Sequence, residues 1–360
     1  MLYLLAILFS AVISVGLTLG VRRLALAFNI VDSPSTDPSR KIHRRPIPLL
    51  GGVGVIGTFL LGILGVLVFF PDLLSGSISG SLLIGISIGS LFILIGGALD
   101  DRYNLPPLLQ LVFPFLASLS VIVSGLDLSF ITNPFGGIFS LSGWEFSVWG
   151  QAYSGVSILF LLAWIFSVSY TTKILDGLDG LVSGIAVISG IILMFLSLAI
   201  GLSDVALLSA IFSGAYLGFL VFNFHPASIF LGESGALFAG FLLSILAVMG
   251  SGKVATAFLV LGIPILDMVW TLFRRMVIER KSPFKGDRKH LHFLLLDRGL
   301  SQRQAVLTLY LFSGIFGLVA LFLQSMGKLV AIIVLIILMI LLLELLYFRK
   351  GNVDGNGIKS

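Results

Sequence analysis

The chain has 360 residues, of which 58% are hydrophobic and 11% charged, and its 22 basic and 17 acidic residues give a net charge of +5. About a quarter of the residues of a soluble globular protein are charged. The composition therefore excludes a soluble globular protein and indicates a polytopic membrane protein. The absence of cysteine excludes disulfides, thiolate zinc sites and cysteine nucleophiles. The apolar residues 1–21 lack a basic n-region and a small-residue cleavage site, so we expect a first span there and not a removable signal peptide.

Continuous apolar stretches of about 20 residues predict membrane-spanning helices, because the bilayer core offers no partner to an unpaired backbone group. Such stretches make one transmembrane domain of residues 1–348. We therefore expect an all-α polytopic integral membrane protein with about 11 transmembrane helices. In chain order, the predicted spans lie near residues 2–21, 49–70, 80–99, 106–124, 153–170, 181–200, 204–222, 230–249, 253–273, 304–323 and 328–348.

The basic residues predict how the chain is oriented. Of the 22, all but Lys253 and Lys328 lie in odd-numbered connections between spans or in the C-terminal tail. Because cytoplasmic connections carry an excess of lysine and arginine, the N-terminus is predicted to lie outside and the C-terminus inside. The odd-numbered connections are then cytoplasmic.

Three segments outside the spans have patterns of their own. The outer connection 125–152 contains an Asn-Pro-Phe-Gly-Gly turn and an alternating aromatic stretch, which predict a small extracytoplasmic β-hairpin. The cytoplasmic loop 274–303 is basic and changes from polar to apolar after His290, which predicts an interfacial helix. Residues 349–360 are predicted to form a disordered cytoplasmic tail.

Acidic residues cluster at the predicted cytoplasmic ends of spans, where a charge is costly in free energy and usually functional. Asp176 and Asp179 share a face if helical, and the glycines between and after them let a phosphate approach the backbone. Several carboxylates beside basic residues suit Mg²⁺ bound to a diphosphate. The clustered residues are Asp100, Asp101, Asp176, Asp179 and Glu233, with His290 and His292 in the ninth connection.

Each of these features also has a plainer interpretation. The paired aspartates suit an ordinary solvated helix end, Glu233 suits a capping acid, and the two histidines suit surface groups. A membrane transporter is a competing interpretation that predicts carboxylates near the middle of spans and two related halves. Only Asp267 lies deeper, and no internal repeat is apparent. Convergence of the acids on one membrane face favours a site there.

Five segments, in order, resemble the polyprenyl-phosphate N-acetylhexosamine-1-phosphate transferases. They are Arg-Lys-Ile-His-Arg-Arg-Pro-Ile-Pro at 40–48 with Gly51-Gly52, Leu-Asp-Asp at 99–101, Asp-Gly-Leu-Asp-Gly-Leu at 176–181, Asn-Phe-His-Pro-Ala through Phe-Leu-Gly-Glu-Ser-Gly at 223–235, and Asp-Arg-Lys-His-Leu-His at 287–292. The resemblance covers nearly the whole chain, and the family's eleven-span branch matches the predicted topology.

The resemblance implies an activity and its partners. Family members move a sugar phosphate from a UDP-sugar to an undecaprenyl-type lipid phosphate, release UMP and require Mg²⁺, for which Mn²⁺ is an expected substitute. The expected partners are therefore undecaprenyl phosphate, a UDP-N-acetylhexosamine and membrane lipid, with no nucleic acid. The expected location is the cell inner (plasma) membrane, with the active site facing the cytoplasm and the lipid-linked product starting a surface glycan. A homodimer is suggested by the resemblance alone.

The resemblance also implies residue roles. Asp100, Asp101, Asp176 and Asp179 are expected to be catalytic, with Asp100 deprotonating or positioning the lipid phosphate, and Glu233 and Asp100 are expected to bind the metal. Phe230 is expected to stack on uracil, and Lys173 to contact the diphosphate or pair with Asp176. The full set of expected substrate-binding residues is Lys41, His43, Arg44, Lys173, Asn223, Phe230, Gly232, Arg288, His290 and His292.

The chain departs from the family pattern at four positions. Tyr170 and Lys173 replace two asparagines, Glu233 replaces a metal-binding aspartate, and Phe293 replaces a third histidine. Glu233 keeps the charge and the oxygen ligands. The segment 287–292 resembles the branch that uses GlcNAc-1-phosphate, so UDP-GlcNAc is the expected donor, ahead of other UDP-N-acetylhexosamines. The departures also leave open an inactive relative that binds lipid phosphate or partners.

Overall fold

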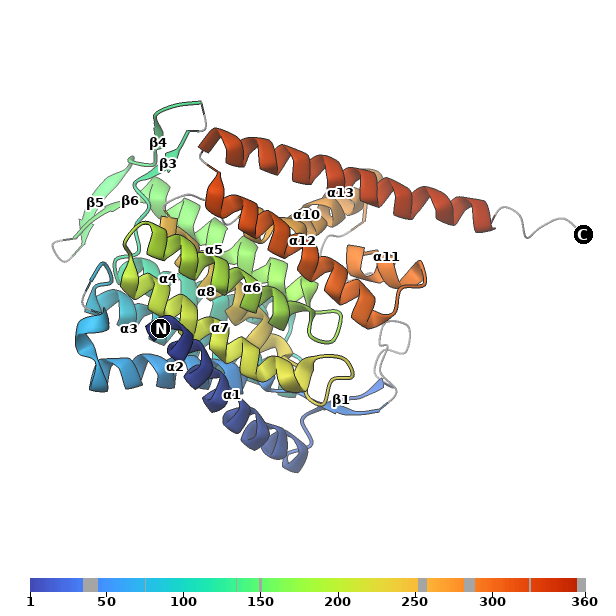
Figure 1. The fold of residues 1–360 in the computed structure, drawn as a ribbon, viewed down its shortest axis with the longest axis horizontal. Coiled ribbons are helices and arrows are strands. Elements are labelled where there is room, and N and C mark those ends of the chain that lie inside the picture. The colour runs from blue at the N-terminus through green and yellow to red at the C-terminus, as the bar shows by residue number, and fades with distance from the viewer. Residues whose placement is uncertain are drawn as a thin grey trace, which may run out of the picture.

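The computed structural model describes residues 1–34, 45–74, 76–133, 135–148, 151–251, 258–281, 289–323 and 325–354. Within these ranges the protein is a bundle of long helices, drawn in Figure 1. The helices are α1 (Leu2–Ala27), α2 (Gly51–Phe69), α3 (Gly80–Tyr103), α4 (Pro107–Val123), α5 (Gly155–Leu175), α6 (Leu181–Ala199), α7 (Ser203–Asn223), α8 (Gly232–Ser251), α10 (Gly262–Phe273), α11 (Leu291–Asp297), α12 (Gln302–Phe322) and α13 (Ser325–Asp354). A 3-10 turn (Pro71–Leu74) follows α2, and a π turn (Arg274–Ile278) continues α10.

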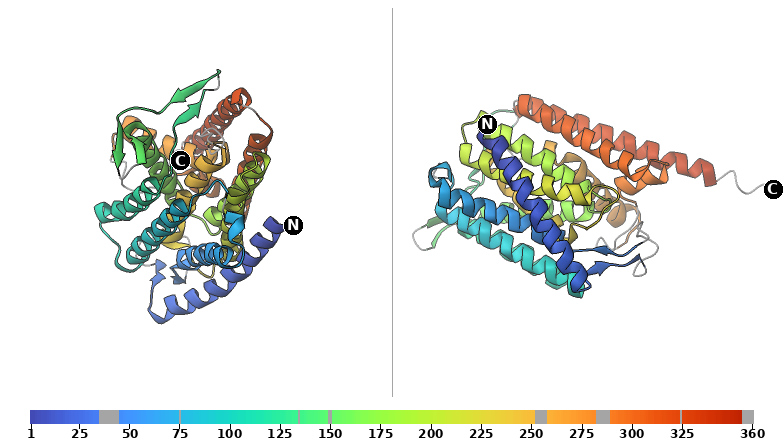
Figure 2. Two further views of the ribbon diagram at one scale, coloured as in Figure 1. Left: turned by 90° about the vertical axis from the view of Figure 1, so that its left-hand side faces the viewer. Right: turned by 60° about the horizontal axis from the view of Figure 1, so that its bottom comes forward.

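The helices confirm an all-α polytopic membrane protein. In the described part of the chain, nine helices are long and apolar enough to cross a membrane. The predicted span 106–124 corresponds to the shorter apolar helix α4, and the described part of the predicted span 253–273 contains α10. The number of crossings and their orientation remain predictions. The start of α1 and the end of α13 lie toward opposite ends of the bundle in Figures 1 and 2.

Six short strands form three antiparallel pairs in the described residues. The connection predicted to hold one hairpin contains two, because β3 pairs antiparallel with β4 and β5 pairs antiparallel with β6. Figure 1 shows these two hairpins at the end of the bundle opposite β1 and α11. The strand pairs are β1 (Val31–Asp32) with β2 (Ile47–Pro48), β3 (Phe130–Thr132) with β4 (Ile138–Ser140), and β5 (Glu145–Val148) with β6 (Gln151–Ser154).

Two predictions about the C-terminal third are changed by the structure. A helix does form in the basic loop, but Leu291, Phe293 and Leu295 on α11 are buried. The apolar run therefore packs into the protein, against α12 and α13, and does not lie on its surface. Helix α13 continues to Asp354, so the beginning of the predicted disordered tail is helical, and residues 355–360 lie outside the described part.

The centre of the bundle is formed by α6, α7 and α8, whose apolar windows are the most deeply buried among the candidate spans. Small residues allow the close packing, since lipid gives no hydrophobic drive for helices to associate. At the start of α8, a side chain on Gly52 of α2 or Gly97 of α3 would overlap the backbone of α8 near Ser234. The first turn of α8 is thereby fixed against α2 and α3 at backbone distance.

Candidate active site

The clustered acids meet at one end of the bundle. Asp100 and Asp101 lie in the last turn of α3, Asp176 directly follows α5, and Glu233 lies in the first turn of α8. Asp101 interacts electrostatically with Glu233, Asp100 and Asp176. The structure thus brings together carboxylates that are more than 130 residues apart in the sequence, at the end of the bundle away from β3–β6.

Asp101 forms the cap of α8. Its Oδ1 accepts a hydrogen bond from the backbone N–H of Glu233 at 2.9 Å, which pairs one of the free N–H groups at the start of that helix. Its Oδ2 is buried and accepts no hydrogen bond from the described residues. Gly232 has a φ of 73° and lies against this second oxygen, so an added Cβ would overlap it. One carboxylate therefore shapes the helix and also offers an oxygen to the cluster.

Gly232→Ala is expected to destabilise the protein by about 1–2 kcal/mol from the left-handed backbone alone, and further through the overlap with Asp101. Thermal unfolding in detergent measures the effect. Gly201→Ala is a matched control, since Gly201 has a φ of 82° and open space at its Cβ position. Equal losses in the two variants would mean that Asp101 does not constrain this position.

Asp100 is held differently, at the end of α3. Its Oδ1 accepts hydrogen bonds from the backbone N–H of Leu105 at 2.8 Å and from Nε2 of Gln110 at 3.0 Å. The helix ends at Asn104, which has a φ of 50°. The two adjacent aspartates therefore have separate partners, as expected because they cannot point at one atom from a regular helix. Gln110 was not identified from the sequence, because a neutral amide near a span end gives no signal.

Lys173 contacts Glu233. Its Nζ forms an ion pair with Oε1 of Glu233, donates a hydrogen bond to Oε1 of Gln110 at 2.9 Å and lies 5.2 Å from the centre of the Tyr170 ring. Among the described residues, the carboxylate that pairs with Lys173 is thus Glu233, not Asp176 as expected. The side chains of Lys173 and Glu233 are 21% and 16% exposed, so the pair is partly shielded from water.

The remaining acids of the cluster differ in their partners. Asp179 Oδ2 contacts Nδ1 of His225 at 2.7 Å and accepts a hydrogen bond from the N–H of Ala227 at 3.1 Å, which ties the start of α6 to the segment before α8. Asp176 carries exposed surface. Burial of its carboxyl group, with the negative charges of Glu233 and Asp179, raises the pKa of Asp176. Of the two, Asp179 is the one whose carboxylate is hydrogen-bonded to the segment before α8.

Asn223, at the end of α7, also connects the start of α6 to the segment before α8. Its Oδ1 accepts hydrogen bonds from the N–H of Gly180 at 3.2 Å and from the Ser183 hydroxyl at 2.8 Å, and its Nδ2 donates to the carbonyl of Ile229 at 3.1 Å. Both ends of the amide are therefore used inside the protein. These hydrogen bonds hold α6 against the segment before α8, and Asn223 is almost completely buried there.

The expected uracil contact, Phe230, lies in a strand-like segment beside β2. Its N–H donates to the carbonyl of Pro48 at 2.8 Å, and its carbonyl accepts from the N–H of Gly51 at 3.0 Å. The ring is partly buried. These contacts bring the motif around residues 45–52 to the start of α8. The predictions for Lys41, His43, Arg44 and Arg288 lie outside the described residues.

The two histidines pack on the cluster through α11. Asp267, the deeper acid noted in the sequence, contacts Nδ1 of His290 at 3.0 Å and accepts from the N–H of Leu291 at 2.8 Å. His292 stacks parallel to His290, with ring centres 5.7 Å apart. The Nε2 of His292 faces Gly177, so closely that an added Cβ there would overlap it. Asp267 is therefore part of a buried anchor for α11, and His292 reaches the segment that carries Asp176.

Gly177→Ala is expected to displace α11 and to destabilise the protein by about 1–3 kcal/mol, the usual range for overpacking a filled site. Thermal unfolding in detergent measures it. The matched control is Gly80→Ala, because a Cβ at Gly80 meets nothing within 4 Å. An unchanged midpoint for Gly177→Ala would contradict the contact between α11 and the 176–179 segment.

Close to the histidines, one acidic side chain, Glu279, contacts three basic side chains. Glu279 accepts from Lys289 at 2.7 Å and also contacts Arg274 and Lys281. Hydrogen bonds from Lys289 and Arg274 lower the pKa of Glu279 to about 2. Glu279 was not identified from the sequence, because it is one charge among many in this loop. Its contacts hold Lys289 beside His290.

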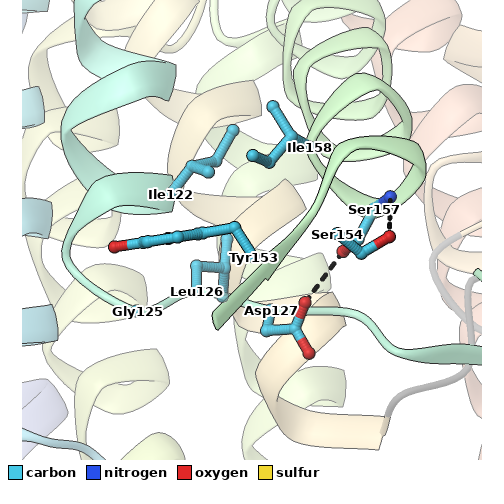
Figure 3. Close-up of a pocket in the computed structure, with 8 residues that line it drawn as sticks. All are labelled: Ile122, Gly125, Leu126, Asp127, Tyr153, Ser154, Ser157 and Ile158. Atoms are coloured by element: carbon cyan, nitrogen blue, oxygen red, sulfur yellow. Dashed lines mark hydrogen bonds between the residues drawn. The ribbon is translucent and has the colours of Figure 1, made fainter. Parts of the chain in front are cut away.

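A pocket also lies at the far end of the bundle, beside the hairpins. It is lined by residues of α4, β6 and α5 with Asp127 between them (Figure 3). Asp127 accepts a hydrogen bond from the hydroxyl of Ser157 at 2.9 Å and another from Ser129. Its carboxylate is therefore already paired inside the protein, and the clustered acids remain the stronger candidate site.

The cluster fits a hard divalent cation by its donor chemistry. Mg²⁺ prefers oxygen ligands and is usually held by one or two carboxylates together with substrate phosphates. Glu233, Asp100 and Asp176 supply such oxygens, and the buried Oδ2 of Asp101 adds one that accepts no hydrogen bond from the described residues. The described residues form no group of three or more acidic or histidine side chains arranged to hold an ion by themselves.

The family model described as glycosyl transferase family 4 matches residues 83–251. A probable undecaprenyl-phosphate N-acetylglucosaminyl 1-phosphate transferase of Bacillus subtilis (strain 168) is 32% identical over 312 residues, covering 85% of this chain and 80% of that protein. The chain belongs to the polyprenyl-phosphate N-acetylhexosamine-1-phosphate transferase family.

Other members of this transferase family are similar at comparable levels. The decaprenyl-phosphate N-acetylglucosaminephosphotransferase of Mycobacterium tuberculosis (strain ATCC 25618 / H37Rv) is 31% identical over 336 residues, which cover 85% of this chain and 78% of that protein. The undecaprenyl-phosphate alpha-N-acetylglucosaminyl 1-phosphate transferase of Thermotoga maritima is 30% identical over 312 residues, with 86% and 88% covered. The matched residues 83–251 run from α3 to the end of α8 and include the whole acid cluster.

Proposed function

We propose that the protein transfers GlcNAc-1-phosphate from UDP-GlcNAc to a polyprenyl phosphate, with undecaprenyl phosphate as the acceptor, and releases UMP. The observation that carries the proposal is the gathering of Asp100, Asp101, Asp176 and Glu233 at one end of a bundle of membrane helices. The names of the similar transferases, which use undecaprenyl or decaprenyl phosphate, support this acceptor class and this sugar phosphate.

The proposed setting is the cell inner (plasma) membrane, with eleven spans, the N-terminus outside and the site facing the cytoplasm. Two observations support it. The acid cluster lies at the end of the bundle away from β3–β6, and the loop that leads to α11 is rich in lysine and arginine. Cytoplasmic connections carry such an excess. The lipid phosphate lies in the headgroup plane, so a site at a bundle end meets both substrates.

Asp100 is the residue that we assign to the acceptor. Its Oδ1 is fixed by Leu105 and Gln110, which leaves Oδ2 to take a proton from the lipid phosphate or to orient it. An oxygen of the ionised lipid phosphate then attacks the β-phosphorus of the UDP-sugar. A new phosphorus–oxygen bond forms as the bond from that phosphorus to the bridging oxygen breaks, and UMP leaves with the electron pair. An ionised phosphate is already a competent nucleophile, which favours direct attack over a covalent aspartyl intermediate.

A bound Mg²⁺ supplies positive charge that offsets the charges of the diphosphate and of the attacking phosphate. Glu233 and Asp100 are the proposed ligands, and Asp101 and Asp176 interact electrostatically with this pair or with each other. Mn²⁺, which accepts the same oxygen donors, is the proposed substitute. The N–H of Glu233 is held by Asp101, so the ligand carboxylate starts from a fixed helix end.

The nucleotide sugar is proposed to bind between the start of α8 and α11. Phe230, whose backbone is held by Pro48 and Gly51, is the residue proposed to stack on uracil. His292 faces Gly177 and His290 is held by Asp267, so both histidines border the segment beside Asp176. Asp179 and Asn223 are assigned to shaping this segment, because Oδ2 of Asp179 and the amide of Asn223 are hydrogen-bonded within the protein.

The test uses purified protein in detergent with undecaprenyl phosphate, Mg²⁺ and, in parallel, UDP-GlcNAc, UDP-GalNAc and UDP-MurNAc-pentapeptide. UMP release and the mass of the lipid product are measured. We expect UMP and a lipid diphosphate GlcNAc with UDP-GlcNAc, and loss of both on chelation of Mg²⁺. A folded protein that releases no UMP from any donor, but still binds lipid phosphate, would instead indicate an inactive relative.

A further inference from the structure

A continuous set of polar contacts joins the two proposed metal-binding carboxylates. Nε2 of Gln110 donates to Oδ1 of Asp100 at 3.0 Å, and Oε1 of Gln110 accepts from Nζ of Lys173 at 2.9 Å. Lys173 in turn pairs with Oε1 of Glu233. We call Gln110 and Lys173 the polar bridge. It crosses from α3 through α4 and α5 to α8 and lies at the level of the acid cluster.

The orientation of the Gln110 amide is fixed on its donor side. Nε2 donates to Asp100 Oδ1 and also to the carbonyl of Leu105 at 2.9 Å, two groups that can only accept. The amide oxygen must then face Lys173, which can only donate. A carboxylate at position 110 would meet Asp100 with a like charge, and an aliphatic side chain would lose both contacts. The amide is therefore matched in direction to each neighbour.

The bridge closes into a ring through the backbone. Glu233, at one end, donates its N–H to Asp101, and Asp101 is the neighbour of Asp100 at the other end. Asp100 also interacts electrostatically with Glu233, and two like charges repel. The ammonium group of Lys173 offsets part of this repulsion from within the ring. Partial burial of Lys173 and Glu233 strengthens the pair relative to one in water.

We propose that Gln110 and Lys173 are positioning residues that hold Asp100 and Glu233 in their relative places for the transfer reaction. This inference rests on the proposed function. It reassigns Lys173 from a substrate contact to a group that acts through Glu233, and it adds Gln110 to the residues on which the reaction depends. Neither side chain is required to touch the nucleotide or the lipid phosphate.

The test is a reciprocal exchange of the two side chains. In Gln110→Lys alone, two ammonium groups face each other, and in Lys173→Gln alone, Glu233 loses its countercharge. In the double variant Gln110→Lys/Lys173→Gln, the order of partners is restored. Lysine at position 110 donates to Asp100 and to the new amide oxygen, and the amide at position 173 donates to Glu233. If the two side chains contributed only by packing, the second substitution would not be expected to restore the activity lost through the first.

Each single variant is expected to lower kcat for UMP release by about 10–100-fold, the range for losing a hydrogen bond to a charged group, with KM for UDP-GlcNAc nearly unchanged. The double variant is expected to recover to within about 5-fold of the native kcat, because contacting residues show non-additive effects. Lys281→Gln is the matched control. It makes the same substitution at a 64% exposed lysine outside the bridge, and native kcat is expected.

The outcomes separate the two proposals. Native protein that releases UMP, with single-variant losses that simply multiply in the double variant, would overturn the bridge and leave the proposed function standing. A rise in KM for UDP-GlcNAc without a fall in kcat would make Lys173 a substrate contact after all. Native protein that releases no UMP contradicts the proposed function. The same four proteins are then compared by thermal unfolding, where midpoints that fall additively would also overturn the bridge.

Discussion

Asp100→Asn is expected to lower the rate of GlcNAc-1-phosphate transfer by about 10²–10⁴-fold, the range for a group that transfers a proton in the transition state. The substitution removes the negative charge of Asp100 but keeps the contacts that hold its side chain in place. Asparagine keeps an oxygen that can accept from Leu105 and Gln110, so the end of α3 is retained. What it loses is the negative charge and the acceptor capacity of the second oxygen. UMP release at saturating substrates measures kcat, and thermal unfolding in detergent checks the fold.

The matched control for this prediction is Asp72→Asn. Asp72 lies in the 3-10 turn after α2, outside the acid cluster, and is exposed. It is expected to keep the native rate. If Asp100→Asn turned over at more than about a tenth of the native rate, Asp100 would only position other groups, since a proton-transfer role contributes at least about 10²-fold.

Glu233→Gln is expected to lower kcat by at least about 100-fold and to raise the Mg²⁺ concentration needed for half-maximal rate. Removing even a hydrogen-bond partner of a metal ligand typically costs 10–100-fold, and here the proposed ligand itself loses its charge. The change also leaves Lys173 without its countercharge in a partly buried place. Turnover is measured across a Mg²⁺ titration, and Mn²⁺ binding to the protein alone is followed by electron paramagnetic resonance.

Glu233→Asp is the matched variant, because it keeps the carboxylate and shortens the side chain by one methylene. It is expected to bind Mn²⁺ and to keep more activity than Glu233→Gln, although the shorter side chain draws back from Lys173. Equal Mn²⁺ affinity in native protein and in Glu233→Gln would remove Glu233 from the proposed metal ligands.

The membrane helices could be predicted from hydropathy, but their ends could not. The predicted third span stops at residue 99 and the fifth at 170, whereas α3 continues to Tyr103 and α5 to Leu175. The apolar stretch of sequence ends where the helix leaves the lipid, but the backbone hydrogen bonds of the helix continue for another turn. The additional turns hold Asp100, Asp101 and Lys173. The functional side chains therefore lie on rigid helix ends, which hydropathy alone assigns to connections.

The acids of the site could be found from sequence because a charge at a span end is costly and stands out. Their partners could not. Lys173 was expected to contact the diphosphate or to pair with the nearby Asp176, and the carboxylate that pairs with it is Glu233, which follows after two further helices. Gln110 contacts Asp100 from the next helix, and His225 contacts Asp179 from the segment before α8. Such contacts depend on which helices are neighbours, and a single sequence does not contain that information.

The two oxygens of Asp101 have a consequence for how distant sequences are compared. One oxygen caps α8, and the other is buried against Gly232 and accepts no hydrogen bond from the described residues. A descendant that had lost the chemistry would still gain from an aspartate here, because the helix end depends on it. Asp100 contributes less to the stability of the fold, since its contacts lie at the exposed end of α3. Retention of the first aspartate of the pair is therefore the better marker of an active lineage, and retention of the second marks inheritance of the fold.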